Sequence, residues 1–104
     1  MFITFRQNNS GGYFIRDENI DVFVIIEGDN LNDILNRAKD VFMDYREYCM
    51  CCGKRWDDDW KNNDDLTQIP MIDDESIYEF NDSYYEGDKI IVYRKDGTKE
   101  TVEL

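Results

Sequence analysis

One short run of residues limits the fold of this chain more than any other feature. Residues 21–27 read Asp-Val-Phe-Val-Ile-Ile-Glu, a nearly continuous apolar stretch that is rich in β-branched side chains. Runs of this length and composition are typical of a β-strand that is covered on both faces. We therefore expect a sheet with this strand as a central member.

The residues after this strand have the pattern of an amphipathic helix. Gly28 and Asp29 break the strand, Asn30 is a favourable N-cap, and Asp33 suits the first turn. Apolar side chains then recur at spacings of three and four along one face: Leu31, Ile34, Leu35, Ala38, Val41, Phe42 and Tyr45. The sequence predicts one helix of roughly four turns over residues 30–46.

Further strands are expected before and after these elements. Residues 1–7 alternate weakly and predict a first strand, and residues 13–15 predict a short strand or a lead-in to one. Residues 76–80 predict another strand, because β-forming side chains return there.

A hairpin is expected at the C-terminal end of the chain. Residues 89–95 and 98–104 flank Asp96-Gly97, which is a strong signal for a two-residue hairpin loop. The predicted fold class is α+β: a small, mostly antiparallel sheet with one amphipathic helix packed on it, in a single domain over residues 1–104. Residues 47–75, which hold the cysteines and the only proline, are expected to be a long irregular segment.

The net charge is concentrated in one third of the chain, residues 57–88, which we call the acidic segment. It contains twelve of the 24 acidic residues but one basic residue, Lys61, so it carries −11 of the total charge of −12. Net charge far from zero opposes compaction, so this segment adds nothing to stability. It predicts either a solvated loop or a surface that meets a positively charged partner.

The composition excludes several classes of protein. A hydrophobic share of 41% is too high for a fully disordered chain, and a pI of about 4.2 argues against direct nucleic-acid binding. No apolar run is long enough to span a membrane, and residues 1–6 lack the pattern of a signal peptide. The three cysteines are too crowded for a disulfide framework, so a reducing, cytosolic location is expected.

The cysteine cluster is the most specific local string. Cys49 and Cys52 have the spacing of a zinc knuckle, Cys51 could be a third ligand, and Gly53 permits the tight turn. There is no second cysteine pair and no histidine, so the remaining ligand would come from residues 57–59 or from a second chain. A small structural zinc protein is one alternative; reduced cysteines packed as small apolar side chains, or a redox pair, are the others.

Two aromatic residues follow the cysteines. Trp56 and Trp60 are four residues apart, so their indoles could share one face of a helix. Such a pair either packs in the core or, together with Arg55, anchors a partner at an interface.

Two strings of residues suggest a family. Arg6-Gln7-Asn8-Asn9-Ser10-Gly11-Gly12 and Cys49-x-Cys51-Cys52-Gly53-x-Arg55-Trp56, separated by an amphipathic segment, resemble small proteins of unknown function encoded by tailed bacteriophages. The resemblance covers residues 1 to about 60 and leaves out the rest of the acidic segment and the hairpin. It implies a phage origin and expression inside a bacterium, and it implies no activity.

The same two strings suggest a shared ligand site. Asn8, Asn9 and Ser10 supply polar side chains, and Gly11 and Gly12 can form a backbone nest for an anion. Arg55 could supply the countercharge. A nucleotide or similar anion would fit such a site. In the alternative interpretation this loop caps the sheet and Arg55 pairs with a carboxylate.

Catalysis and calcium binding are less well supported. An EF-hand that started at Asp57 would have Asn62 where glycine is needed and Gln68 where glutamate is needed. The chain has no histidine, no Ser-His-Asp set and no Walker or Rossmann loop, so it is not predicted to be an enzyme.

The sequence best supports an acidic interaction protein in the cytoplasm of an infected bacterium. It would bind a basic host protein and inhibit or redirect it, and one version of this hypothesis is mimicry of the charge of DNA. The residues expected to contact the partner are Trp56, Asp57, Asp58, Asp59, Trp60, Asp64, Asp65, Asp73, Asp74 and Glu75. The sequence does not decide between a monomer and a homodimer.

Overall fold

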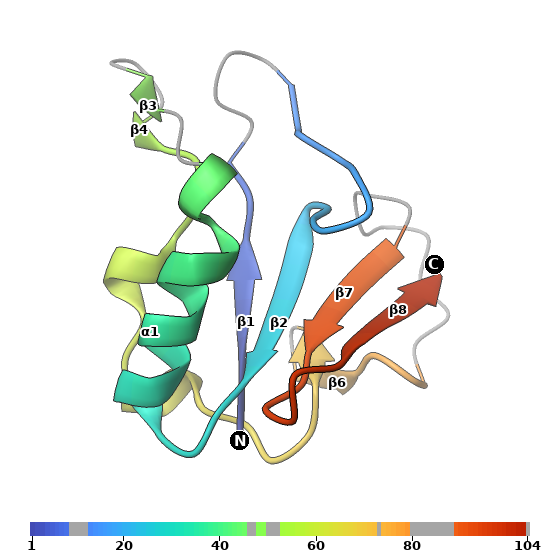
Figure 1. Cartoon of the computed structure of the whole chain (residues 1–104). Helices are drawn as coiled ribbons and strands as arrows, with labels where there is room; N and C mark the ends of the chain where they lie inside the picture. The colour runs from blue at the N-terminus through green and yellow to red at the C-terminus, as the bar shows by residue number, and fades with distance from the viewer. Residues whose placement is uncertain (9–12, 46–47, 50–52, 73, 80–88, 104) are drawn as a thin grey trace.

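The computed structural model describes residues 1–8, 13–45, 48–49, 53–72, 74–79 and 89–103. Four strands form the main sheet in the order β1 (Phe2–Arg6), β2 (Phe23–Glu27), β7 (Lys89–Tyr93) and β8 (Lys99–Glu103) (Figure 1). β1 pairs with β2 and β7 pairs with β8 in antiparallel register, whereas β2 and β7 are parallel. The α+β class is confirmed, and the sheet is mostly antiparallel as predicted, with one parallel pair between β2 and β7.

β2 is the central strand that the apolar run predicted. Val24, Ile25 and Ile26 are each 0% exposed, because β1 and β7 flank the strand and both faces of the sheet are covered. The parallel pairing with β7 follows from the connection between the two strands. After β2 the chain leaves the sheet as α1 and returns to it much later, and parallel neighbours require a long crossover of this kind.

The helix α1 runs from Leu31 to Val41 and is shorter than predicted. Asn30 is its N-cap, and the Asn30 side-chain oxygen accepts a hydrogen bond of 2.9 Å from the Asp33 backbone N–H. Phe42 is the C-cap, and the chain continues as a 3-10 helix over Met43–Tyr45. None of the helices in the described ranges has the length and apolar character that a bilayer span requires.

The C-terminal hairpin is confirmed, but its loop is longer than two residues. Tyr93 and Lys99 are the last paired residues, and the Arg94 N–H donates to the Thr98 carbonyl at 2.8 Å. Gly97 has φ of 92°, a conformation that favours glycine. Glycine at this point is typical of the longer hairpin loops that end in a left-handed residue.

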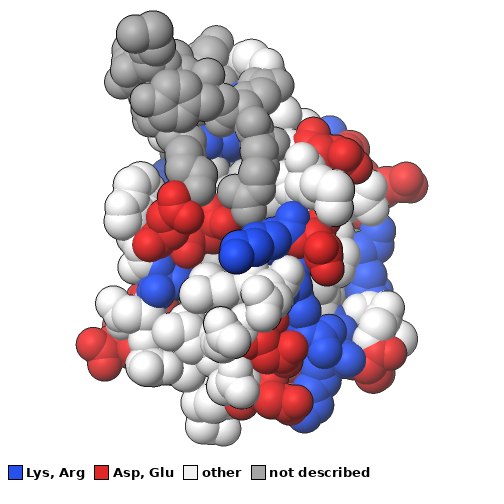
Figure 2. All heavy atoms as spheres, turned by 60° about the vertical axis from the view of Figure 1, so that its left-hand side comes forward, with Lys and Arg blue, Asp and Glu red and all other residues white. Residues whose placement is uncertain are grey.

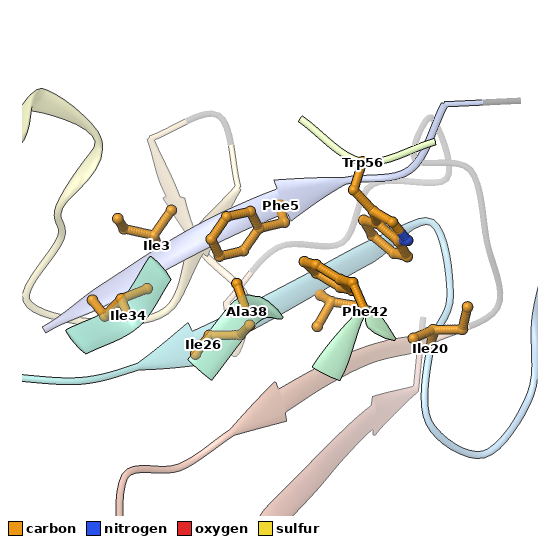
Figure 3. Close-up of a cluster of buried hydrophobic side chains, with 9 residues drawn as sticks. Ile3, Phe5, Ile20, Ile26, Ile34, Ala38, Phe42 and Trp56 are labelled. Carbon is orange, nitrogen blue, oxygen red and sulfur yellow. The ribbon is translucent and has the colours of Figure 1, made fainter. Parts of the chain in front are cut away.

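One face of the sheet packs against α1. Figure 3 shows side chains from β1, β2 and α1 meeting in a cluster, with Trp56 entering from a later part of the chain. The buried members of this first cluster are Ile3, Phe5, Ile20, Val24, Ile26, Ile34, Ala38, Phe42 and Trp56.

The opposite face is covered by chain without a helix. β5 (Met71–Ile72) and β6 (Glu75–Ser76) pair with each other, and Ile72 and Ile77 pack against the sheet. The buried members of this second cluster are Phe2, Val22, Phe23, Ile25, Ile72, Ile77, Ile90 and Val92.

The remaining predicted elements are met only in part. Residues 13–15, within the described part of the chain, lie in no strand. The strand expected over 76–80 is two residues long and ends at Ser76. Within 47–75 the described elements are all short, as an irregular segment implies: β3 (Tyr48–Cys49), β4 (Gly53–Lys54), 3-10 helices Asp58–Trp60 and Asn63–Asp65, β5 and the start of β6.

Candidate binding site

Residues 55–67, which we call the edge segment, run antiparallel along the outer side of β1. Bridges join Gln7 to Trp56 at one end and Phe2 to Thr67 at the other. Phe2 and Thr67 exchange two backbone hydrogen bonds of 2.8 and 2.9 Å. The edge segment therefore covers an edge of the sheet that would otherwise present unpaired backbone groups.

Asp57 attaches the middle of the edge segment to β1. Its Oδ1 accepts a hydrogen bond of 3.1 Å from the Arg6 backbone N–H. Its Oδ2 lies 3.0 Å from Lys61 Nζ, one helical turn further along the chain. The first acidic residue of the segment thus serves a structural role on the sheet.

A capping box fixes the next pair of acidic residues. The Asn62 side-chain oxygen accepts from the Asp64 N–H at 2.8 Å, and Asp65 Oδ2 accepts from the Asn62 N–H at 2.8 Å. These bonds satisfy donors at the start of the 3-10 helix. Asp64 and Asp65 consequently stand at defined positions on the surface.

A groove of about 420 Å³ opens between the edge segment and the second face of the sheet; we call it the aspartate groove. It is lined by residues of β1, β2, the edge segment and β5 with its following turn: Thr4, Arg6, Phe23, Asp57, Lys61, Asp64, Asp65, Thr67, Met71, Ile72 and Asp74. Four carboxylates and two basic groups line it, so its formal charge is −2.

The two basic groups of the groove are both engaged with this chain. The guanidinium carbon of Arg6 lies 5.6 Å from the centre of the Phe23 ring. Lys61 Nζ pairs with Asp57 and lies 6.0 Å from the centre of the Phe5 ring. Among the described residues, no ion pair includes Asp64 or Asp74.

The structure brings together four of the ten residues predicted to contact a partner. Asp57, Asp64, Asp65 and Asp74 line the aspartate groove although the first and the last are seventeen positions apart in the sequence. Asp59, Trp60 and Glu75 are exposed but do not line the groove. Asp73 lies outside the described residues.

Two of the predicted partner contacts are wrong because their side chains are buried. Trp56 is 2% exposed, and its ring stacks on Phe42 with 4.0 Å between ring centroids and 11° between ring planes (Figure 3). Asp58 is 8% exposed. Trp60 is 71% exposed, so the two indoles do not share a face, because the chain forms a single turn of 3-10 helix here.

Arg55 does not serve as an exposed countercharge for an anion, because it is 1% exposed. Its Nη1 donates to Gln7 Oε1 at 3.0 Å and to the carbonyls of Asn8 and Tyr13 at 3.3 and 3.1 Å. Its guanidinium also lies over the Tyr13 ring, 5.1 Å from the centroid. The buried cation therefore joins Asn8 to Tyr13, which gives it a structural role.

The other predicted ligand and metal residues fall largely outside the described part of the chain. Asn9, Ser10, Gly11 and Gly12 are outside it, as are Cys51 and Cys52, and for Cys49 only the backbone in β3 is described. Among the residues that are described, no group of three or more histidine, cysteine, aspartate or glutamate side chains could hold a metal ion.

The surface charge is mixed on the side of the molecule that carries α1. Figure 2 shows several groups of acidic side chains on this side, with basic side chains beside many of them. A duplex backbone would present anions without such interruption. Among the described residues on the side seen in Figure 2, negative charge is therefore interrupted by positive charge.

Several residues of the groove were missed by the sequence interpretation. Thr4 and Arg6 belong to a strand that was predicted, and they alternate with the buried Ile3 and Phe5. That alternation places both polar side chains on the face opposite α1. The alternation of buried and polar residues in this strand was a usable signal. The residues that form the groove together with Thr4 and Arg6 come largely from 57–74, far along the chain, and this could not be seen from the strand itself.

A family comparison covers almost the whole chain. The family described as a domain of unknown function (DUF7296) matches residues 1–103. The chain belongs to this family. No curated protein and no solved structure matches it. The family description assigns no activity, so the phage origin and the host partner remain predictions.

Proposed function

We propose that this protein is an acidic binding protein that recognises a positively charged partner protein through the carboxylates around the aspartate groove. The observation that supports this most strongly is the attachment of the edge segment to β1. The backbone bonds at Phe2 and the Asp57 bond to Arg6 N–H hold the segment against a covered sheet. Carboxylates carried in this way have fixed positions, as a recognition surface needs.

The distribution of exposed and buried groups also supports a binding role. Asp64, Asp74 and Glu75 are exposed, whereas the apolar side chains nearby, such as Ile72, are buried. Charge on a fixed surface raises association rates and selects against wrong partners more than it adds affinity. If the resemblance to phage proteins holds, the partner is a basic protein of the bacterial host.

The test is capture of basic proteins from a bacterial lysate by the immobilised full-length protein, at salt concentrations from about 50 mM to about 500 mM. One variant neutralises three exposed acids near the groove, Asp64→Asn, Asp74→Asn and Glu75→Gln. The matched control neutralises three exposed acids elsewhere, Asp40→Asn, Asp44→Asn and Glu103→Gln. Both variants change the net charge by the same amount.

We expect a basic protein to be captured at low salt and lost as salt rises. The groove variant should retain about tenfold less of that protein than the control does, since exposed ion pairs each contribute up to about 1 kcal/mol. Salt-insensitive capture, or equal losses in both variants, would contradict the proposal.

A further inference from the structure

The lining of the aspartate groove is partly apolar and partly charged. Its apolar side is formed by Phe23, Met71 and Ile72, and its charged side includes Asp64 and Asp74. Phe23 is 8% exposed and Ile72 is 2% exposed, and both belong to the second core cluster, whereas Met71 is half-buried and keeps apolar surface toward the groove. An occupant would meet a fixed apolar surface and free carboxylates at once.

We propose that the groove receives a lysine or arginine side chain of the partner. The methylene stem would lie against Met71, the lining side chain that is only half-buried, and the cationic end would meet Asp64 and Asp74. Long basic side chains bury their stems on apolar surface and keep their charge beside polar groups in this manner. This inference rests on the proposed function and specifies what the groove recognises.

Two of the chain's own cations already belong to the lining of the groove. Lys61 places its Nζ 3.0 Å from Asp57 with a side chain that is 18% exposed, and Arg6 lies over the Phe23 ring. After these two cations the groove still has a formal charge of −2. One or two further positive groups would therefore be complementary in charge to the lining.

The size and charge of the groove argue against other occupants. A volume of about 420 Å³ lies at the small end of the range for ligand sites, which suits one or two side chains. An anion such as a nucleotide would meet the surplus of carboxylates. The described residues contain no group of three or more histidine, cysteine, aspartate or glutamate side chains that could hold a metal ion.

The test uses a tetra-arginine peptide with blocked ends as the probe, titrated into the ¹⁵N-labelled full-length protein. Amide shifts are expected to change at Thr67, Met71 and Asp74, which line the groove, and to stay unchanged in α1. Shifts that are spread over the whole surface would overturn the inference.

A matched pair of variants tests the site directly. Asp64→Lys places a cation at the groove, and Asp44→Lys makes the same change of charge away from it. Both aspartates are exposed and occupy the middle position of a three-residue 3-10 helix. We expect the peptide Kd to rise about tenfold in the first variant and less than about twofold in the second. Equal effects would overturn the inference.

Two arrangements keep the result interpretable. If Asp64→Lys lowers the thermal midpoint, Asp64→Asn replaces it, with an expected rise in Kd of about threefold. The lysate capture described above tests the proposed function independently. A basic partner that is lost in the triple groove variant but captured equally by Asp64→Lys and Asp44→Lys would leave the proposed function standing and refute the groove as the place that receives its basic side chain. Peptide binding in the groove without any captured partner would support the groove as a site for basic side chains and contradict the proposed function.

Discussion

The two faces of the sheet are covered in different ways. One face is covered by α1, a single regular helix whose buried residues, Ile34 and Ala38, are four positions apart. The other is covered by β5, β6 and the turns around them, in which no described element exceeds two residues. Both coverings bury side chains almost completely, at 0% exposed for Ile34 and 2% for Ile72. Regular structure is therefore sufficient for a packed face but not necessary.

The difference lies in where the stabilising bonds come from. α1 satisfies its backbone groups within itself and needs the sheet only for its apolar face. The covering of the second face depends on bonds to distant residues, such as that from Thr4 Oγ1 to the Met71 carbonyl at 2.5 Å. The edge segment is intermediate, because it is bonded to β1 and sends Trp56 into the core under α1.

The largest expected effect is at Trp56, which connects the edge segment to the helix-covered face. Trp56→Ala would remove the ring that stacks on Phe42 and should lower the free energy of unfolding by about 4 kcal/mol. Urea unfolding followed by circular dichroism measures this. Trp60→Ala is the control, with an expected change within about 0.5 kcal/mol, because that ring is 71% exposed. Similar losses in both variants would show that the edge segment is not anchored as described.

The comparison of the two faces is tested by a pair of smaller truncations. Ile34→Ala removes a buried side chain under α1, and Ile72→Ala removes one from the face without a helix. Each should cost about 3 kcal/mol of unfolding free energy, because both side chains are buried in packed clusters. A loss below about 1 kcal/mol for Ile72→Ala alone would break the comparison, since it would mean that the second covering is loosely packed.

These differences explain which parts of the fold could be predicted. Periodicity is a local signal, so β1, β2, α1 and the hairpin strands followed from residues 1–7, 21–27, 30–46 and 89–104. The parallel pairing of β2 and β7 could not follow, because it joins residues that are more than sixty positions apart. The end of α1 at Val41 was also missed, because the apolar spacing continues through Tyr45 in a tighter 3-10 turn.

For the candidate site, only the amino-acid composition of the segment that forms it could be predicted. The acidic character of residues 57–75 was clear, but not which acids would share a groove. Asp57 and Asp58 are adjacent, yet one lines the groove and the other is buried. Arg55 was a ligand contact in one interpretation and the partner of a carboxylate in the other, and its sequence position gave no sign of the three oxygen atoms that bind its Nη1.

A smaller effect is expected where Asp57 attaches the edge segment to β1. Asp57→Ala would leave the Arg6 backbone N–H without its acceptor and Lys61 without its 3.0 Å partner. The expected cost is about 1 kcal/mol of unfolding free energy. Amide hydrogen exchange at Arg6 should accelerate more than exchange at Val24 in the centre of the sheet. Unchanged exchange at Arg6 would show that this attachment is dispensable.

The smallest effect concerns a pH-sensitive contact beside the helix-covered face. Burial raises the pKa of Asp17. Hydrogen bonds from the Asn19 N–H, the Tyr45 hydroxyl and the Ile20 N–H together lower it by more than burial raises it, so the pKa of Asp17 lies below the ordinary value of 3.8. A carboxylate of this kind adds stability above its unfolded-state pKa and loses it as the pH falls through its folded-state pKa.

Asp17→Asn should therefore lower the free energy of unfolding at about pH 7 by less than about 1 kcal/mol, because the group is exposed. It should also reduce the loss of stability below pH 3.8. Urea unfolding at several pH values measures both effects. If Asp17→Asn loses unfolding free energy at acidic pH as steeply as the unaltered protein does, Asp17 contributes nothing to that loss.

Because the two tryptophans differ in exposure, the intrinsic fluorescence of the protein can report on two different regions. Trp56 is 2% exposed inside the core, and Trp60, four residues later, is 71% exposed. An aqueous quencher should therefore reach the Trp60 indole at once and the Trp56 indole only when the core opens. Intrinsic fluorescence can thus separate events at the surface of the edge segment from global unfolding without any added label.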